Sequence, residues 1–265
     1  MRIQANGISI GYDLDGPSEA PVVTMSHSLA ANRDMWWPQT NELQKNHRVL
    51  RYDTRGHGES DATKGPYSIS LLVNDVVSLL DELDIKATHF VGLSMGGMIG
   101  QLLAANHPDR LLSLTLCATA CRMAPEMEPV WDERIKSANQ NGMASIAETT
   151  IERWFTHPYR ISNATEVERI LQIIKNTPVK GFEGCSHAIK VLDQLQCLER
   201  ITAPTLILVG ANDPSTPPAA SEIIQKHIVG SVMTVIANAS HLLNVEQATH
   251  FNEQLFTFLE GRTGT

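Results

Sequence analysis

The residues with the clearest capacity for chemistry are at positions 92–96, where the sequence reads Gly-Leu-Ser-Met-Gly. A serine between two glycines in this pattern is typical of a sharp strand-to-helix turn that exposes the serine hydroxyl. The glycines are required because the strand and helix backbones approach too closely there for Cβ atoms. An apolar strand pattern precedes the turn and a helical pattern follows it. We therefore predict that Ser94 is a nucleophile.

A serine hydroxyl needs a general base, and the base needs a carboxylate to orient it. In hydrolases that hold the serine on such a turn, the acid and then the histidine follow it along the chain. Asp213 comes directly after a buried strand pattern, and His241 comes between the last strand pattern and the last helix. These positions favour Asp213 as the acid and His241 as the base. Asp193 and His250 are the weaker candidates.

The oxyanion that forms during acyl transfer needs two preorganised backbone N–H donors. One is expected from Met95, which follows the nucleophile, and the other from the loop after the third strand pattern. That loop is at residues 26–30, Ser-His-Ser-Leu-Ala, which makes the Leu29 N–H the second donor. We interpret His27 as a residue that braces this loop rather than as a catalytic residue.

Residues 53–60 read Asp-Thr-Arg-Gly-His-Gly-Glu-Ser, a composition that could suggest a metal or phosphate loop. No second histidine or carboxylate stands at metal-ligand spacing, and no Lys-Ser or Lys-Thr pair follows as in a phosphate-binding loop. We interpret the segment as a rigid turn below the active site. The sequence predicts neither a metal nor a cofactor.

The elements that must position these residues alternate between strand and helix patterns over residues 1–121 and again over 200–265. This alternation predicts an α/β fold with a mostly parallel central sheet flanked by helices. Residues 8–12 are expected to form an edge strand of that sheet. Residues 122–199 carry helical patterns without a convincing strand, so we predict an inserted all-helical cap at the carboxyl ends of the strands.

The bulk composition excludes several classes of partner. The chain has 265 residues and a formal net charge of −8, which argues against binding to nucleic acid or an anionic membrane. Its start lacks the apolar run of a secretory signal, and no apolar run is long enough for a membrane helix. The four cysteines form no CxxC pair and are expected to be reduced. These features predict a cytoplasmic enzyme whose partner is a small molecule.

Taken together, residues 53–60, the glycine-flanked serine, the late aspartate and the final histidine resemble the α/β-hydrolase family over nearly the whole chain. A finer similarity is to the 3-oxoadipate enol-lactonases (carboxymethylbutenolide lactonases). The segments that carry it are 92–100, 116–120, 131–134, 184–189, 210–218 and 241–247. This resemblance implies an α/β-hydrolase fold and a serine hydrolase that opens a small enol-lactone through an acyl-enzyme, in the catabolism of aromatic compounds.

The cap is expected to set substrate size, with Trp131, Arg134, Trp154 and Cys185 as candidate pocket residues. Arg134 could pair with a carboxylate of the substrate, because a guanidinium binds one in a bidentate manner. The chain departs from the enol-lactonases at residues 26–30, where they typically carry Ser-Asn-Ser-Leu-Gly, and after Cys185. A carboxylesterase of broader specificity, another lactonase, or a perhydrolase or C–C hydrolase using the same triad therefore remain alternatives.

Overall fold

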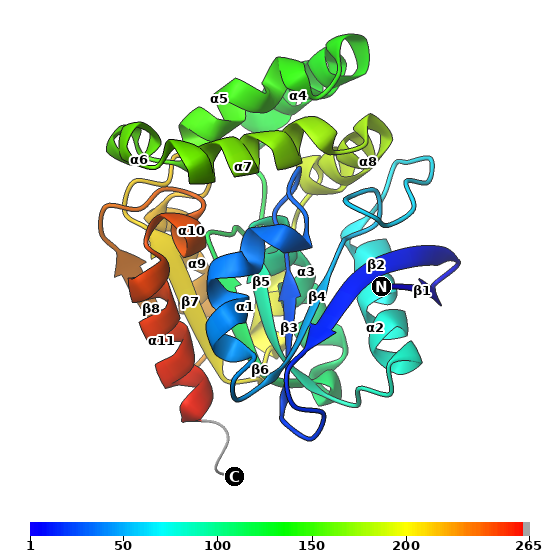
Figure 1. The fold of residues 1–265 in the computed structure, drawn as a ribbon, viewed down its shortest axis with the longest axis vertical. Coiled ribbons are helices and arrows are strands. Elements are labelled where there is room, and N and C mark those ends of the chain that lie inside the picture. The colour runs from blue at the N-terminus through cyan, green and yellow to red at the C-terminus, as the bar shows by residue number, and fades with distance from the viewer. Residues whose placement is uncertain (262–265) are drawn as a thin grey trace.

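The computed structural model describes residues 1–261, which contain one eight-stranded sheet in the order β1-β2-β4-β3-β5-β6-β7-β8 (Figure 1). The strands are β1 (Arg2–Ala5), β2 (Ile8–Asp15), β3 (Val22–Ser26), β4 (Arg48–Tyr52), β5 (Thr88–Leu93), β6 (Leu111–Cys117), β7 (Thr205–Gly210) and β8 (Val232–Ile236). Strands β3 to β8 pair in parallel, whereas β1 and β2 are antiparallel to their neighbours. The predicted mostly parallel sheet is thus confirmed.

The expectation that residues 8–12 form an edge strand is wrong. Strand β2 extends to Asp15, and β1 pairs along its outer side with Arg2 opposite Gly11. The four residues of β1 alternate between exposed polar and more buried apolar side chains, but four residues are the lower limit of length at which alternation indicates a strand. The central strands β5 and β7 are buried at every position, which explains the apolar runs at 90–93 and 206–209.

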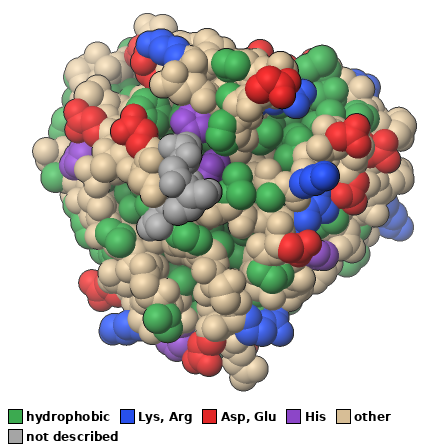
Figure 2. Space-filling model, turned by 90° about the horizontal axis from the view of Figure 1, so that it is seen from below, with side chains coloured by type: hydrophobic (Ala, Val, Ile, Leu, Met, Phe, Trp, Pro, Cys, Tyr) green, Lys and Arg blue, Asp and Glu red, His purple; other side chains and the backbone are tan. Residues whose placement is uncertain are grey.

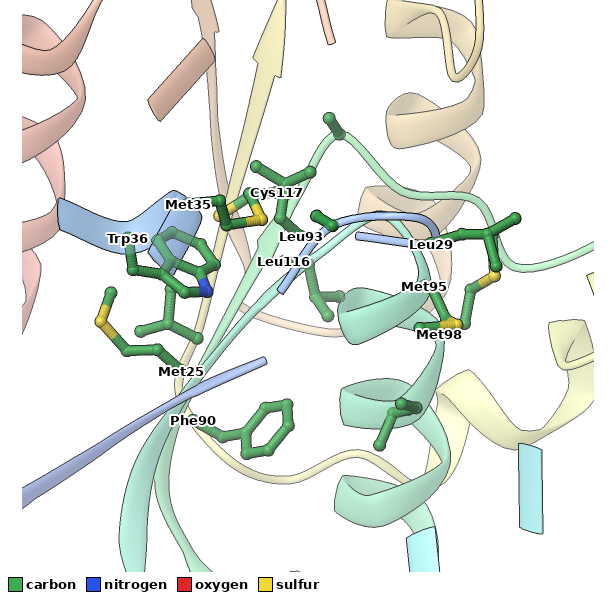
Figure 3. Packing of buried hydrophobic residues seen from close by; sticks show 14 of the residues in the cluster. Met25, Leu29, Met35, Trp36, Phe90, Leu93, Met95, Met98, Leu116 and Cys117 are labelled. Carbon is green, nitrogen blue, oxygen red and sulfur yellow. The ribbon is translucent and has the colours of Figure 1, made fainter. Parts of the chain in front are cut away.

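Helices cover both faces of the sheet. On one face α2 (Ile69–Glu82), α3 (Met95–Asn106) and α9 (Pro218–His227) pack, and on the other α1 (Trp37–Leu43), α10 (Leu243–Glu246) and α11 (Ala248–Glu260) (Figure 1). Helix α3 contacts β5 and β6 directly, so the turn that precedes it is held against the middle of the sheet. In Figure 3 the side chains of Phe90, Leu93 and Leu116, which extend from β5 and β6, belong to the buried hydrophobic core.

A layer of five helices lies across one end of the sheet (Figure 1). They are α4 (Glu128–Asn141), α5 (Ala144–Trp154), α6 (His157–Ser162), α7 (Ala164–Asn176) and α8 (Val179–Lys190). The chain enters this layer after β6 and leaves it before β7. The 3₁₀ helix η4 (Leu195–Arg200), which falls almost wholly within the predicted cap at 122–199, instead packs against α3 and α9.

The opposite end of the molecule is shown in Figure 2. Acidic and basic side chains are interspersed there with hydrophobic ones. Within residues 1–261, no helix combines the length and apolar character that crossing a bilayer requires.

Candidate active site

The turn that carries Ser94 is strained and closely packed. Ser94 lies between β5 and α3 with φ 55° and ψ −111°, a conformation rare for a residue with a side chain. A Cβ on Gly92 would lie 2.2 Å from the carbonyl oxygen of Gly96, and one on Gly96 would lie 2.2 Å from the carbonyl oxygen of Ser26. Any residue with a Cβ atom would clash at either position. The two glycines therefore allow the backbones of the strand, the turn and the helix to pack this closely.

The backbone of Ser94 is held by the neighbouring strand β6. Its N–H donates to the Cys117 carbonyl at 2.8 Å, and the hydroxyl of Thr119 donates to its carbonyl oxygen at 2.8 Å. These bonds stabilise the strained conformation, since a rare backbone geometry persists only where its surroundings over-determine it.

Asp213 and His241 meet at the carboxyl ends of β7 and β8. The His241 Nδ1 lies 2.8 Å from Asp213 Oδ2, and both residues are buried. The other carboxylate oxygen of Asp213 accepts the backbone N–H groups of Ser215 and Thr216, and the Thr216 hydroxyl donates to Oδ2. Burial raises the pKa of a carboxyl. Here the attraction of His241 and the hydrogen bonds outweigh burial and hold the pKa of Asp213 below its usual value.

This arrangement leaves one nitrogen of His241 available as a base. A carboxylate can only accept, so Nδ1 carries the proton of the neutral ring and Nε2 keeps its lone pair. Ser94 and His241 line the same narrow cavity, of about 70 Å³, between the sheet and the helical layer. The lining is completed by Ser28, Leu29, Met98, Met123, Trp131, Arg134, Arg153, Trp154, Ile189, Ser215 and Thr216.

The two backbone N–H groups predicted to bind an oxyanion, those of Met95 and Leu29, have no hydrogen-bond partner among the described residues. Met95 is the first residue of α3, where amides have no carbonyl partner within the helix. In the loop after β3, Ser28 N–H donates to the Met35 sulfur and Ala30 N–H donates to His57. Within the described chain no such partner takes up the Leu29 N–H, which lies between them. Figure 3 shows Leu29 beside Met95 and Met98.

His27 and His57 connect this loop to the loop after β4. The Nε2 of His27 accepts the Thr54 N–H at 2.9 Å, and its Nδ1 donates to the Ser28 carbonyl at 2.7 Å. The Nε2 of His57 accepts the Ala30 N–H at 3.1 Å. Burial lowers the pKa of His27 to about 4 and that of His57 to about 3, so both rings are neutral and keep the acceptor that the loop needs.

Asp53, the first residue of the 53–60 segment, has a structural role. Its carboxylate accepts the backbone N–H groups of Arg33 and Glu59, at 2.8 and 2.9 Å, and pairs with the Arg33 guanidinium. Among residues 1–261, no three histidine, cysteine, aspartate or glutamate side chains are grouped so as to hold a metal ion.

The helical layer contributes two arginines to the cavity. The Arg134 guanidinium lies 4.8 Å from the centre of the Trp131 ring and 5.7 Å from that of Phe182. Its Nε is buried without a hydrogen-bond partner in the described residues. Arg153 donates to the Thr150 hydroxyl at 3.4 Å. Burial, with a smaller contribution from the charge of Arg153, lowers the pKa of Arg134 from 12.5 to about 9. The hydrogen-bond and ring contacts of both arginines are thus to neutral groups, and the charge of Glu152 only partly offsets burial, which lowers the pKa of Arg153.

Of the four predicted pocket residues, Trp131, Arg134 and Trp154 line the cavity and Cys185 does not. The Cys185 sulfur is buried near the Arg55 carbonyl, at 3.8 Å. The neighbouring glycine on α8, Gly181, contacts the backbone of Gly56 so closely that an added Cβ would lie 1.8 Å from its carbonyl oxygen. Along this face of α8, Gly181 and Cys185 therefore pack on the core, and Ile189, one turn further along the helix, lines the cavity.

The sequence analysis missed Arg153, Met98 and Met123 as cavity residues. Arg153 lies in the last turn of α5, directly before Trp154. Consecutive helical residues point about 100° apart, so a single cavity contacted by both is unexpected from helical spacing. Both line the cavity because the last turn of α5 lies over it. Only the position of that end relative to the sheet could have revealed Arg153.

A family model described as the alpha/beta hydrolase fold matches residues 21–248. The chain belongs to this family. It is 35% identical over 250 residues to 3-oxoadipate enol-lactonase 2 of Acinetobacter baylyi, covering 94% of this chain and 92% of that protein. The enol-lactonase from Burkholderia xenovorans LB400 superposes with a TM-score of 0.95 at 37% identity, covering 98% of this chain and 100% of that one. The enzyme is a hydrolase, similar to 3-oxoadipate enol-lactonases.

A thermophilic esterase from Thermogutta terrifontis, solved with malate bound, superposes with a TM-score of 0.93 at 27% identity, covering 98% of each chain. The same fold is thus shared by proteins described as an enol-lactonase and as an esterase.

Proposed function

We propose that this hydrolase opens a small, anionic lactone by serine catalysis, with 3-oxoadipate enol-lactone as its substrate in aromatic-compound catabolism. One observation carries the proposal: the cavity that Ser94 shares with His241 is also lined by Arg134 and Arg153, neither of which forms an ion pair within residues 1–261. A half-buried cation without an ion-pair partner is costly. A substrate carboxylate would supply the missing charge. The similarity to enol-lactonases supports the same assignment.

The proposed reaction has two stages. His241 Nε2 takes the proton of Ser94 as the serine oxygen bonds to the lactone carbonyl carbon, and the Met95 and Leu29 N–H groups hold the oxyanion. The ring C–O bond then breaks, and His241 returns the proton to the leaving oxygen. In the second stage His241 takes a proton from water as the water attacks the acyl carbon. The serine oxygen leaves, recovers the proton and releases the acid.

The walls and charge of the cavity set the expected selectivity. Trp131 and Trp154 provide flat apolar walls on which a ring can lie. A carboxylate bound to the arginines holds the ring in one orientation relative to Ser94, which is how remote binding energy contributes to rate.

A neutral-ester hydrolase is the second candidate, because an esterase shares the fold at 27% identity. The first test is labelling with a neutral fluorophosphonate, using Ser94→Ala as the control. Labelling of the parent enzyme but not of the variant supports Ser94 as the nucleophile, and equal labelling of both contradicts it.

The second test compares initial rates on 3-oxoadipate enol-lactone with those on p-nitrophenyl acetate. A kcat/KM that favours the lactone by at least about 100-fold is expected, corresponding to about 2.7 kcal/mol. A preference for the neutral ester would refute the lactone assignment and favour the esterase. Products formed with peroxide, or from a ring-cleavage diketone, would reveal perhydrolysis or C–C hydrolysis.

A further inference from the structure

The loop that carries His241 is bonded to the helical cap on both sides of the histidine. The Ser240 hydroxyl donates to the Arg153 carbonyl at 2.7 Å. The Leu242 N–H donates to the Trp154 carbonyl at 3.0 Å. The cap segment at 153–156, which we call the hinge segment, joins α5 to α6. It therefore contacts the residue before and the residue after the proposed general base.

Glu246, on the short helix α10, completes this connection. One oxygen of its carboxylate accepts the Thr156 N–H at 3.0 Å and the Thr156 hydroxyl. The other oxygen accepts the Ser240 N–H at 2.8 Å. The residue is 6% exposed. A single carboxylate thus accepts three hydrogen bonds, two from the hinge segment and one from the residue next to His241.

The hinge segment also forms part of the cavity wall. The side chains of Arg153 and Trp154 line the cavity. The Trp154 ring lies 6.1 Å from the His241 ring, measured between centroids. Arg153, which would bind a substrate carboxylate, is therefore part of the hinge segment. His241, which would act as the base, is connected to the same segment through Glu246 and Ser240.

We propose that Glu246 is a positioning residue that fixes the His241 loop relative to the hinge segment. It thereby places the His241 ring and the Arg153 side chain correctly for the same substrate. This inference rests on the proposed catalytic role of His241. Since an ionised carboxylate makes stronger hydrogen bonds than a neutral group, Glu246 is suited to bind three donors at once. An amide in its place has a single oxygen, and its NH₂ group would face an N–H donor.

The test compares Glu246→Gln with Tyr159→Phe, a matched control. The Tyr159 hydroxyl donates to the Val245 carbonyl at 3.3 Å, so it also joins the cap to α10 but does not contact the His241 loop. For Glu246→Gln we expect kcat on p-nitrophenyl acetate to fall roughly 10- to 100-fold, because small displacements of a catalytic group have effects of this size. Labelling of Ser94 by a neutral fluorophosphonate should slow in parallel. Tyr159→Phe should change both by less than about twofold.

On the enol-lactone, Glu246→Gln should also raise KM severalfold, whereas KM for the neutral ester should stay within about twofold, since only the lactone uses Arg153. A Thr156→Val/Glu246→Gln double variant should be no slower than Glu246→Gln alone, because both substitutions remove the same connection. Thermal unfolding of every variant is measured beside the rates.

Equal rates for Glu246→Gln and Tyr159→Phe would overturn the proposal, as would strictly additive losses in the double variant. If Glu246→Gln lowers the melting temperature but keeps the parental rates at assay temperatures below that melting temperature, Glu246 has a purely structural role. If the parent enzyme labels at Ser94 but does not turn over the lactone, the substrate assignment fails, while the ester and labelling measurements still decide the role of Glu246.

Discussion

Replacing Arg134 with methionine should make the enzyme more stable and less active on an anionic substrate. Methionine keeps much of the length and apolar contact of the arginine stem but removes the charge. A pKa lowered from 12.5 to about 9 corresponds, at 1.36 kcal/mol per pKa unit, to a cost of about 5 kcal/mol for keeping the guanidinium charged in the fold. Since Arg134 is partly exposed to the cavity, water there reduces this cost, which is therefore an upper bound.

The substitution also loses the contacts of the guanidinium with the Trp131 and Phe182 rings, which contribute about 1 to 2 kcal/mol each. The balance predicts a gain of about 1 to 3 kcal/mol in the free energy of unfolding. A carboxylate about 4 Å from the guanidinium gains about 4 kcal/mol at an effective dielectric constant of 20. The variant should therefore lose roughly 30-fold to a few thousandfold in kcat/KM on the enol-lactone.

The assay combines urea unfolding with initial rates on the lactone and on p-nitrophenyl acetate, whose kcat/KM should change by less than about threefold. Arg169→Met is the control, because Arg169 also stacks on a tryptophan ring, Trp37 at 4.1 Å, but outside the cavity. It should leave both rates unchanged and slightly lower stability. If Arg134→Met is destabilised and loses both activities in proportion, Arg134 supports the cap and does not bind the substrate, and the reasoning fails.

Two further predictions concern the loops around the nucleophile. Gly96→Ala should destabilise the fold by about 1 to 3 kcal/mol and abolish labelling of Ser94, because its Cβ would lie 2.2 Å from the Ser26 carbonyl oxygen. Gly261→Ala, whose nearest such contacts are at 3.7 Å, is the control, and equal melting temperatures would contradict the argument. The stabilising effect of neutral His27, with its pKa near 4 in the fold and 6.5 unfolded, is complete above pH 6.5 and is lost as the pH falls towards 4. His27→Asn should therefore make the decline of unfolding free energy between pH 6.5 and 4 shallower, and an unchanged slope in urea titrations would disprove it.

Much of the fold was predictable because its signals are local. The apolar runs of β5 and β7 indicate burial of those segments themselves. The glycines around Ser94 indicate a tight turn at that same position. Strand β1 was missed because its alternating pattern covers only four residues. The position of β1 is determined by its pairing with the free edge of β2, and the sequence of β1 alone does not specify that pairing.

The candidate site divides in the same way. The sequence by itself identified Ser94, Asp213 and His241 as the candidate triad, because each follows a strand of the parallel sheet, and parallel strands bring their carboxyl ends to one edge. Only the tertiary structure decided which cap residues face them. It turns Cys185 towards the core and places Arg153 in the cavity, because the direction of a side chain on a packed helix depends on where that helix sits against the sheet, and local residue patterns do not specify this position. The hydrogen bond from Thr156 to Glu246 joins residues that are 90 positions apart in the sequence. It likewise depends on how the helical layer sits on the sheet, which local residue patterns do not specify.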